Sequence, residues 1–357
     1  MPSSEEDGTA AAAEQLGSMS LLDSVESKAP PDAEKEDETK PAKLFCSACG
    51  KESDTAKKCT ACKCAWYCDK DCQKNHRREH KEECRRIKKV LDERGSKLDL
   101  GTELDVGPLG RMPPREECPI CMRALPLHIK LQRYSDCCGQ RLCAGCSFQH
   151  LVKAAQTQVP STCAFCREPF SKSEEETLAR RRSRCERKDP NALLMLALDY
   201  GHGYHGGLGL PKDQAKCVEL LRESAALGCP AAQYELGTFY HTGLMGLERD
   251  HEEAMKHYEK AAEGGHVISQ HGLGCIAGLK GDNVASFRHW RLSAAGGCTG
   301  SMETLIGMFE GGFLQHGDLA ETMRAFYRSR AELMSKDRDA FIRHLKMTGK
   351  YKKLYDL

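Results

Sequence analysis

The feature that most constrains this chain is the spacing of its cysteines. Between residues 44 and 170 they occur in closely spaced pairs, and the pairs follow one another in two groups that each provide eight ligands. A tetrahedral zinc ion takes four thiolate or imidazole ligands, which two such pairs supply. Random placement of cysteines would not give so many consecutive pairs. We therefore predict two small modules, each folded around two zinc ions, or four ions in all.

The first module, residues 44–86, contains four successive ligand pairs. The last of these pairs is a His followed four residues later by a Cys, a spacing that places both side chains on one face of a helix. The eight predicted ligands are Cys46, Cys49, Cys59, Cys62, Cys68, Cys72, His80 and Cys84.

This module resembles the MYND zinc finger. The resemblance rests on the cysteine spacing together with Trp66-Tyr67-Cys68, Cys72-Gln73 and His80-Lys81. It implies a protein-interaction module, often one for proline-containing peptides. Arg77 stands where such fingers commonly have Trp, so this chain departs from the peptide-binding pattern but not from the metal-binding pattern. The resemblance also implies two interleaved zinc sites, formed by Cys46, Cys49, Cys68 and Cys72 and by Cys59, Cys62, His80 and Cys84.

Further residues of this module leave alternatives open. Cys64 lies outside the pattern and is expected to be unligated, although it competes with Cys62 in an alternative arrangement. His76 is an alternative ligand to His80. The basic helix expected over Lys74–Lys89 offsets the negative charge of thiolate–zinc sites, and contact with nucleic acid is the less favoured interpretation.

The second module, residues 114–170, again contains four ligand pairs. Cys137 and Cys138 are adjacent and project differently, so Asp136, His128 or His150 is an alternative to one of them. The predicted ligands are Cys118, Cys121, Cys137, Cys138, Cys143, Cys146, Cys163 and Cys166.

The order of these pairs resembles a RING finger in an all-cysteine version. The matching stretches are Cys118-Pro119-Ile120-Cys121, Cys138-Gly139 and Cys163–Pro169. The resemblance implies cross-braced sites, one formed by Cys118, Cys121, Cys143 and Cys146 and the other by Cys137, Cys138, Cys163 and Cys166.

Active RING fingers act as ubiquitin-protein ligases, and the resemblance implies a surface that contacts a ubiquitin-conjugating enzyme. Ile120, the helix expected over Ser147–Ala155, Pro169 and Arg167 match the positions that contact a ubiquitin-conjugating enzyme or the activated ubiquitin, whereas Ala164 departs from a common Pro. Such a ligase works by orienting another enzyme's thioester and forms no covalent intermediate. The alternative is a non-enzymatic adaptor in which this finger is only structural.

From about residue 191 the chain becomes repetitive. Leu196-Ala197, Leu236-Gly237, Leu273-Gly274 and Ile306-Gly307 recur at spacings of 40, 37 and 33 residues. A period near 36 with two helices per unit predicts an all-α helix-turn-helix solenoid over residues 191–333. The match is closest to Sel1-like repeats, which are related to tetratricopeptide repeats, and this resemblance implies binding of peptides or protein segments.

The remaining segments complete the predicted organisation. Residues 1–43 hold 11 acids against 4 lysines and are expected to be a disordered acidic tail. Residues 87–113 and 171–190 are expected to be linkers, the second charged and basic, and residues 334–357 a capping helix and tail. The fold class predicted is multidomain, with two zinc-stabilised α+β fingers followed by the helical solenoid.

Charge and sequence motifs argue against several classes of function. The net charge of +1 favours no nucleic-acid partner, and the longest apolar run, Ala192–Leu198, is too short to span a membrane. The acidic N-terminus resembles no secretory signal, so 21 cysteines predict a reducing compartment, cytoplasmic or nuclear. No phosphate loop or nucleophile–base motif indicates another chemistry, and other proteins or peptides are the expected partners.

Overall fold

A computed structural model describes residues 44–94, 109–110, 112–202 and 208–348. The predicted acidic tail (1–43), residues 95–108 and 111 of the predicted 87–113 linker, residues 203–207 of the predicted repeats and residues 349–357 of the predicted C-terminal tail lie outside the described residues. Within the described ranges, no helix combines the length and apolar character needed to cross a membrane.

The first module combines a short hairpin with a long helix. Strand β1 (Lys57–Lys58) pairs in antiparallel fashion with β2 (Trp66–Tyr67), and α1 (Lys70–Arg94) follows directly. Asp69 starts this helix because its carboxylate accepts a hydrogen bond of 2.7 Å from the Cys72 N–H. The helix expected over Lys74–Lys89 is present and continues through the first residues of the predicted 87–113 linker.

The second module has the same elements in the same order, a short hairpin and then a helix, with a 3₁₀ turn before them. After the 3₁₀ turn η1 (Ile129–Leu131), strands β3 (Gln132–Tyr134) and β4 (Arg141–Cys143) form an antiparallel pair, and α2 (Ala144–Gln156) follows. Helix α2 covers the helix expected over Ser147–Ala155. The buried core is small, and apart from cysteines it contains Leu125, Leu142 and Ala164.

The segment interpreted as a charged linker, residues 171–190, forms the helix α3 (Glu174–Glu186). Ser173 caps it by accepting a hydrogen bond from the Glu176 N–H, and glutamates in the first turn favour its N-terminus. Its basic cluster is only partly solvated, because the Arg181 side chain is buried against acidic neighbours. Sequence alone gave no sign of those neighbours, since they lie far away along the chain.

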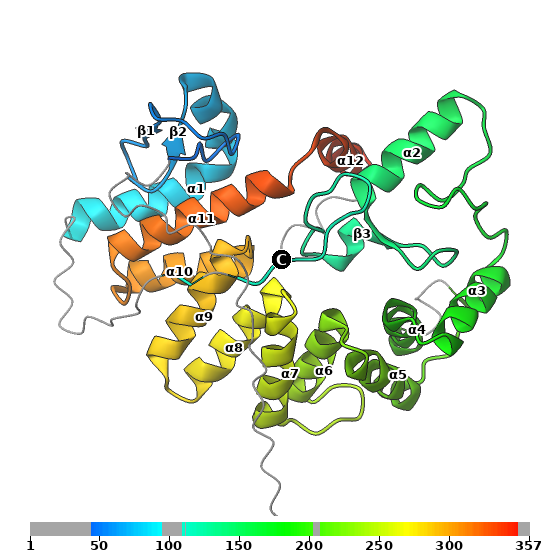
Figure 1. The fold of residues 1–357 in the computed structure, drawn as a ribbon. Helices are drawn as coiled ribbons and strands as arrows, with labels where there is room; N and C mark the ends of the chain where they lie inside the picture. Colours follow the sequence, from blue (N-terminus) through cyan, green and yellow to red (C-terminus); the bar gives the residue numbers. More distant parts are fainter. Residues whose placement is uncertain (1–43, 95–108, 111, 203–207, 349–357) are drawn as a thin grey trace, which may run out of the picture. The chain divides into compact units, whose positions relative to one another are not determined.

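The repeat region is a succession of helix pairs, visible as the green-to-yellow helices of Figure 1. Each pair buries its shared face, so the core continues from one pair to the next. The six helices are α4 (Pro190–His202), α5 (Gln214–Ala226), α6 (Pro230–Thr242), α7 (His251–Glu263), α8 (Val267–Leu279) and α9 (Asn283–Ala295).

Two local signals recur in this region. The second helix of each pair starts at an aspartate whose side chain accepts hydrogen bonds from backbone N–H groups of the first turn: Asp213, Asp250 and Asp282. Glycine allows the paired helices to approach, since a Cβ at Gly237 would lie 2.7 Å from the Tyr258 ring. Gly274 has the same relation to Trp290, at 2.6 Å. These glycines belong to the recurring Leu-Gly landmark.

A fourth pair, α10 (Thr299–Gly311) and α11 (His316–Leu333), differs from the other three. Its buried residues Leu305, Phe309 and Phe326 share one hydrophobic cluster with Tyr67 and Ile87 of the first module. The last repeat pair and the first finger therefore share a core.

The C-terminal helix α12 (Lys336–Met347) was expected to cap the repeat stack. Its buried residues Phe341 and Leu345 instead lie in a cluster with Ala144 and Phe148 of α2. The Phe148 and Phe341 ring centroids are 5.4 Å apart. An apolar helix face packs wherever a matching face is available, and here the second module supplies it.

Candidate metal centres

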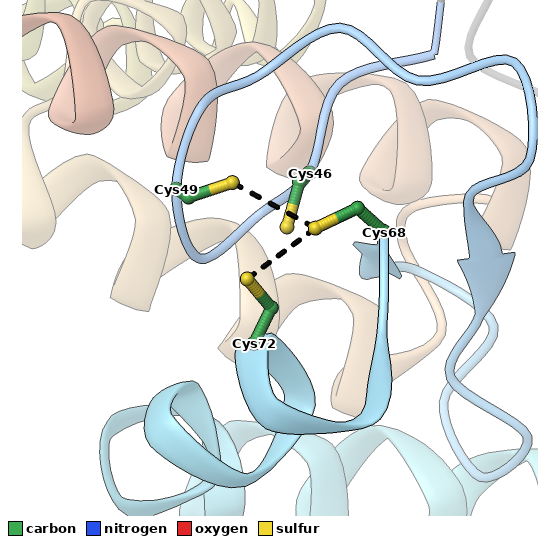
Figure 2. A group of neighbouring side chains, drawn as sticks. All are labelled: Cys46, Cys49, Cys68 and Cys72. Atoms are coloured by element: carbon green, nitrogen blue, oxygen red, sulfur yellow. Dashed lines mark hydrogen bonds between the residues drawn. The ribbon is translucent and has the colours of Figure 1, made fainter.

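Four of the eight predicted ligands of the first module converge on one point. Figure 2 shows the sulfur atoms of Cys46, Cys49, Cys68 and Cys72 directed toward one another, with Cys72 in the first turn of α1. The Cys49 and Cys68 Sγ atoms are 3.9 Å apart, and those of Cys68 and Cys72 are 3.4 Å apart. All four ligand atoms lie within 4.8 Å of one another, and Cys49 is exposed. We call this group the outer site.

The other four ligands form a second group, which we call the inner site because three of its four residues are buried. Cys59, Cys62, His80 and Cys84 have their ligand atoms within 4.8 Å of one another. His80 Nε2 lies 3.2 Å from Cys62 Sγ, and Cys59 Sγ lies 3.6 Å from Cys84 Sγ. His80 and Cys84 are one turn apart on α1, as the i, i+4 spacing requires. The two sites are interleaved along the chain.

His80 also has a partner on its other ring nitrogen. Tyr327 of α11 places its hydroxyl 3.0 Å from His80 Nδ1 and 2.6 Å from a carboxylate oxygen of Glu83. Burial lowers the pKa of His80, but contacts with the Cys59 and Cys62 thiolates raise it overall. His76, the alternative ligand, instead has its Nδ1 3.0 Å from the Tyr67 hydroxyl.

Cys64 lies outside both sites. Its buried thiol donates to the Cys62 carbonyl at 3.2 Å and lies 3.3 Å from His316 Nε2. The residue therefore contacts the backbone of a ligand loop and is not part of either group of ligand atoms.

The predicted ligands of the second module also form two groups within the same 4.8 Å limit. Cys118, Cys121, Cys143 and Cys146 form one, in which the Cys121 and Cys143 sulfurs are 3.9 Å apart. Hydrogen bonds from the Cys143 and Cys146 thiols strongly lower the pKa of Cys118.

The other group contains both of the adjacent cysteines. Cys138 Sγ lies 3.9 Å from Cys163 Sγ, and Cys137 Sγ lies 3.4 Å from Cys166 Sγ. The structure thus brings together Cys137, Cys138, Cys163 and Cys166, without Asp136, His128 or His150. The His150 ring bonds to Thr162 and Arg167 instead.

Backbone N–H groups favour the metal-binding thiolate form of one cysteine in each module. Burial raises the pKa of Cys46, but N–H groups including those of Cys68 and Cys49 bring it down to about 7. Burial likewise raises the pKa of Cys163, yet the Cys166 N–H contributes to lowering it to about 6. Thiolates are the species that bind metals.

Arginines surround the second module's ligand loops. Arg181 bonds to Asp136 at 2.7 and 3.0 Å and also pairs with the buried Asp199 of α4. Arg184 donates to the carbonyl oxygens of Asp136 and Cys137, at 2.8 and 2.7 Å. The basic cluster predicted to be part of a linker therefore holds the Cys137–Cys138 loop, a role that the sequence does not signal.

Arg338 of α12 reaches the module's first site from another direction. Its guanidinium lies 3.6 Å from Cys121 Sγ and donates to the Leu333 carbonyl at 2.5 Å. Burial lowers the pKa of Arg338, but the Cys143 and Cys121 thiols raise it overall. The spacing of the cysteines gave no signal for this residue.

The residues predicted to contact a conjugating enzyme lie at the surface of the second module. Ile120 is 41% exposed, and Arg167 and Pro169 are also exposed. The Arg167 guanidinium lies 2.9 Å from His150 Nδ1. Leu151 and Phe165 add exposed apolar side chains from α2 and the last cysteine pair.

Zinc fits all four groups of ligands. Each offers four soft or borderline donors at mutual distances suited to one tetrahedral ion, and His80 presents Nε2 while Nδ1 is held elsewhere. Bound zinc would stabilise modules whose own cores are small.

Comparisons with known proteins agree with two of the three regions. Residues 46–84 match the family model of the MYND finger. Residues 190–229, 230–266 and 267–298 match the Sel1 repeat. The chain thus contains a MYND finger and three Sel1 repeats, and the fourth helix pair lies beyond the matched residues. The RING-type resemblance of residues 116–170 stays a prediction.

Two solved structures resemble the chain. A Sel1 repeat protein from Oxalobacter formigenes is 28% identical over 36% of this chain and 96% of its own length, with a TM-score of 0.31. The protective antigen c5321 of uropathogenic Escherichia coli, with an SLR fold, is 22% identical over 57% of this chain and 49% of its own, with a TM-score of 0.39.

Proposed function

We propose that this protein is a zinc-organised scaffold for protein interactions, holding four zinc ions, two in each cysteine module. The observation that carries the proposal is the convergence of sixteen predicted ligands into four groups within 4.8 Å. Zinc fingers and Sel1 repeats both suggest protein interaction, and no catalytic machinery is needed for that role. We propose the cytoplasm or the nucleus as its location, because free thiols persist in reducing compartments.

Zinc content tests the metal part of the proposal. Elemental mass spectrometry of protein purified without added metal should give about four zinc ions per chain. Cys59→Ser should remove about one ion, whereas Cys185→Ser, a thiol outside the four groups, should remove none. A wild-type content near two would contradict the four-ion proposal.

Binding of proline-containing peptides tests the interaction part. Fluorescence anisotropy with a library of such peptides should find binders that are lost when zinc is removed by a chelator. Trp66 is half-buried beside Lys58, whose Nζ lies 4.7 Å from its ring centroid, and offers a surface aromatic for proline. Trp66→Ala should weaken such binding, and binding unchanged by chelation would argue against a role for the fingers.

A second candidate function is ubiquitin-protein ligation through the second module. The observation that favours it is the exposure of Ile120, Leu151 and Phe165, three large apolar side chains of this one module. Such a surface would orient a ubiquitin-conjugating enzyme, with Arg167 contacting the activated ubiquitin.

Self-ubiquitination with a panel of conjugating enzymes tests this candidate. Ile120→Ala and Arg167→Ala should each reduce product at least tenfold. Val159→Ala, an exposed apolar residue outside the cysteine pairs, should leave it unchanged. A wild-type protein inert across the panel would leave the non-enzymatic adaptor as the function.

A further inference from the structure

The inner site of the first finger is contacted by a helix more than two hundred residues further along the chain. Tyr327 and His316, both on α11, contact this site at two points. They are eleven residues apart, about three helical turns, so they lie on the same face of the helix. One face of α11 therefore contacts the inner site twice. Helix α11 itself lies beyond the residues that match the Sel1 repeat.

The contact by Tyr327 forms a chain of hydrogen bonds with one consistent direction. A zinc-binding His80 uses Nε2, so its proton is on Nδ1 and is donated to the Tyr327 oxygen at 3.0 Å. The Tyr327 hydroxyl donates in turn to the Glu83 carboxylate at 2.6 Å. Each donor has one acceptor, and the chain ends on a carboxylate that stabilises it.

The surroundings fix this arrangement. Tyr327 is only 5% exposed, and its ring packs edge-on against those of His76 and His80, with centroids 4.7 and 6.0 Å away. Because the Tyr327 hydroxyl donates its proton to Glu83, its oxygen can only accept from His80, so Tyr327 stabilises the state in which His80 Nδ1 carries the proton.

The second contact of α11, by His316, is with the loop that carries Cys62. Its Nε2 lies 2.9 Å from the carbonyl oxygen of the ligand residue Cys62 and 3.3 Å from Cys64 Sγ. Tyr327 thus contacts the His ligand, and His316 contacts the loop that carries a Cys ligand.

We propose that α11 is an outer part of the inner zinc site, in which Tyr327 is the positioning residue that orients His80 for the metal. Metal binding and the docking of α11 are then linked, and each favours the other. This inference rests on the proposed zinc binding. Partners of this kind on a metal-bound His typically contribute a 10–100-fold effect on metal affinity.

The test is Tyr327→Phe in the full-length protein, which removes only the hydroxyl. Titration of metal-free protein with Co²⁺ separates a site with three thiolates and one imidazole from all-thiolate sites by its absorption spectrum. Competition with a chromophoric chelator then gives zinc affinities. We expect the inner site to lose tenfold or more in affinity while the three all-cysteine sites keep theirs.

Matched variants keep the result interpretable. Tyr258→Phe removes the hydroxyl of another buried tyrosine, 3.3 Å from Thr238 in the repeats, and should leave all metal affinities unchanged. Glu83→Gln, which weakens the end of the hydrogen-bond chain but keeps its shape, should give a smaller loss at the inner site. It serves as the test if Tyr327→Phe does not fold.

The outcomes are distinct. Equal inner-site affinity in wild type, Tyr327→Phe and Glu83→Gln overturns the inference, as does an equal loss at all four sites. If the wild type takes up no metal, the proposed function fails instead. Hydrogen exchange supplies the reciprocal measurement, because metal removal should raise exchange in α11 more than in α6.

Discussion

Distant helices contact the metal sites of both cysteine modules, but the contacting groups differ in their chemistry. The first finger shares an apolar core with α10 and α11, and a neutral hydroxyl contacts its buried inner site. The second module also packs apolar residues against α12, but the contacts to its ligand loops come from the arginines Arg181, Arg184 and Arg338.

The charge of each site explains the difference. Three thiolates, one neutral imidazole and Zn²⁺ sum to −1, whereas four thiolates and Zn²⁺ sum to −2. The inner site is therefore the least charged of the four and tolerates apolar burial. The first finger's outer site is fully thiolate but partly exposed, so water stabilises it. The second module's all-thiolate sites are partly exposed as well, and arginines of α3 and α12 contact their ligand loops in addition.

Zinc removal should have the largest effect on stability and is the most direct test of the comparison between the two modules. Structural zinc contributes on the order of 10 kcal/mol to modules of this size. We expect chelation to unfold both modules and, because of the shared core, to loosen α10 and α11 while α4–α7 stay folded. Hydrogen exchange with mass spectrometry measures this, and full protection retained in α10 and α11 would contradict the shared core. Acid should act like a chelator, because protons compete for thiolates.

Arg181→Ala should have the next largest effect. It leaves Asp136 and the buried Asp199 without their cation, which costs about 3–5 kcal/mol. The urea midpoint should fall strongly. Arg180→Ala on the same helix, which breaks a more exposed pair with Glu176, should cost less than about 1 kcal/mol. Equal losses of stability in Arg181→Ala and Arg180→Ala would mean that the burial of Arg181 does not contribute to stability.

Arg338→Met sharpens the comparison at the opposite face of the second module. Loss of the guanidinium should weaken zinc binding at Cys118, Cys121, Cys143 and Cys146 by about tenfold, since it removes a cation beside thiolates. Chelator competition measures the change. Arg343→Met, an exposed arginine on the same helix, is the control and should behave as wild type.

Glu235→Gln tests the repeats, where no metal is involved. Burial raises the pKa of Glu235 to about 7, above the ordinary value of 4.5. The folded state therefore binds the proton more tightly, so this group's stabilisation is complete below pH 4.5 and is lost as pH rises through 7. Gln removes that loss and should stabilise the protein by about 2 kcal/mol at pH 8.

Thermal unfolding of the two proteins across pH 4.5–8 checks this expectation. The gap between wild type and Glu235→Gln should widen as the pH rises. Glu259→Gln, an exposed carboxylate on α7, should show no such trend. A gap that does not depend on pH would mean that Glu235 is not titrating in this range.

The sequence by itself determined everything that depends on short spacing. The spacing determined the eight ligand pairs, because each pair lies within five residues, where backbone geometry dictates which side chains meet. Which pairs share one metal was implied only by the family resemblances, and the structure brings the ligand atoms together in those four groups. The Leu-Gly landmarks fixed the helix pairs, because a recurring apolar face must be buried by its neighbour. The recurring aspartate caps are equally readable in the sequence, since each precedes the helix that it caps.

Only the tertiary structure decided which distant helices complete the metal centres. Tyr327 is 247 residues from His80, and Arg338 is 217 residues from Cys121. No local pattern marks either residue, since a tyrosine or an arginine on a helix is compatible with many partners. The same holds for α12, whose apolar face fits a repeat stack and a finger equally well until packing selects one. Long-range contacts depend on complementary surfaces meeting in three dimensions, and residue spacing does not encode that complementarity.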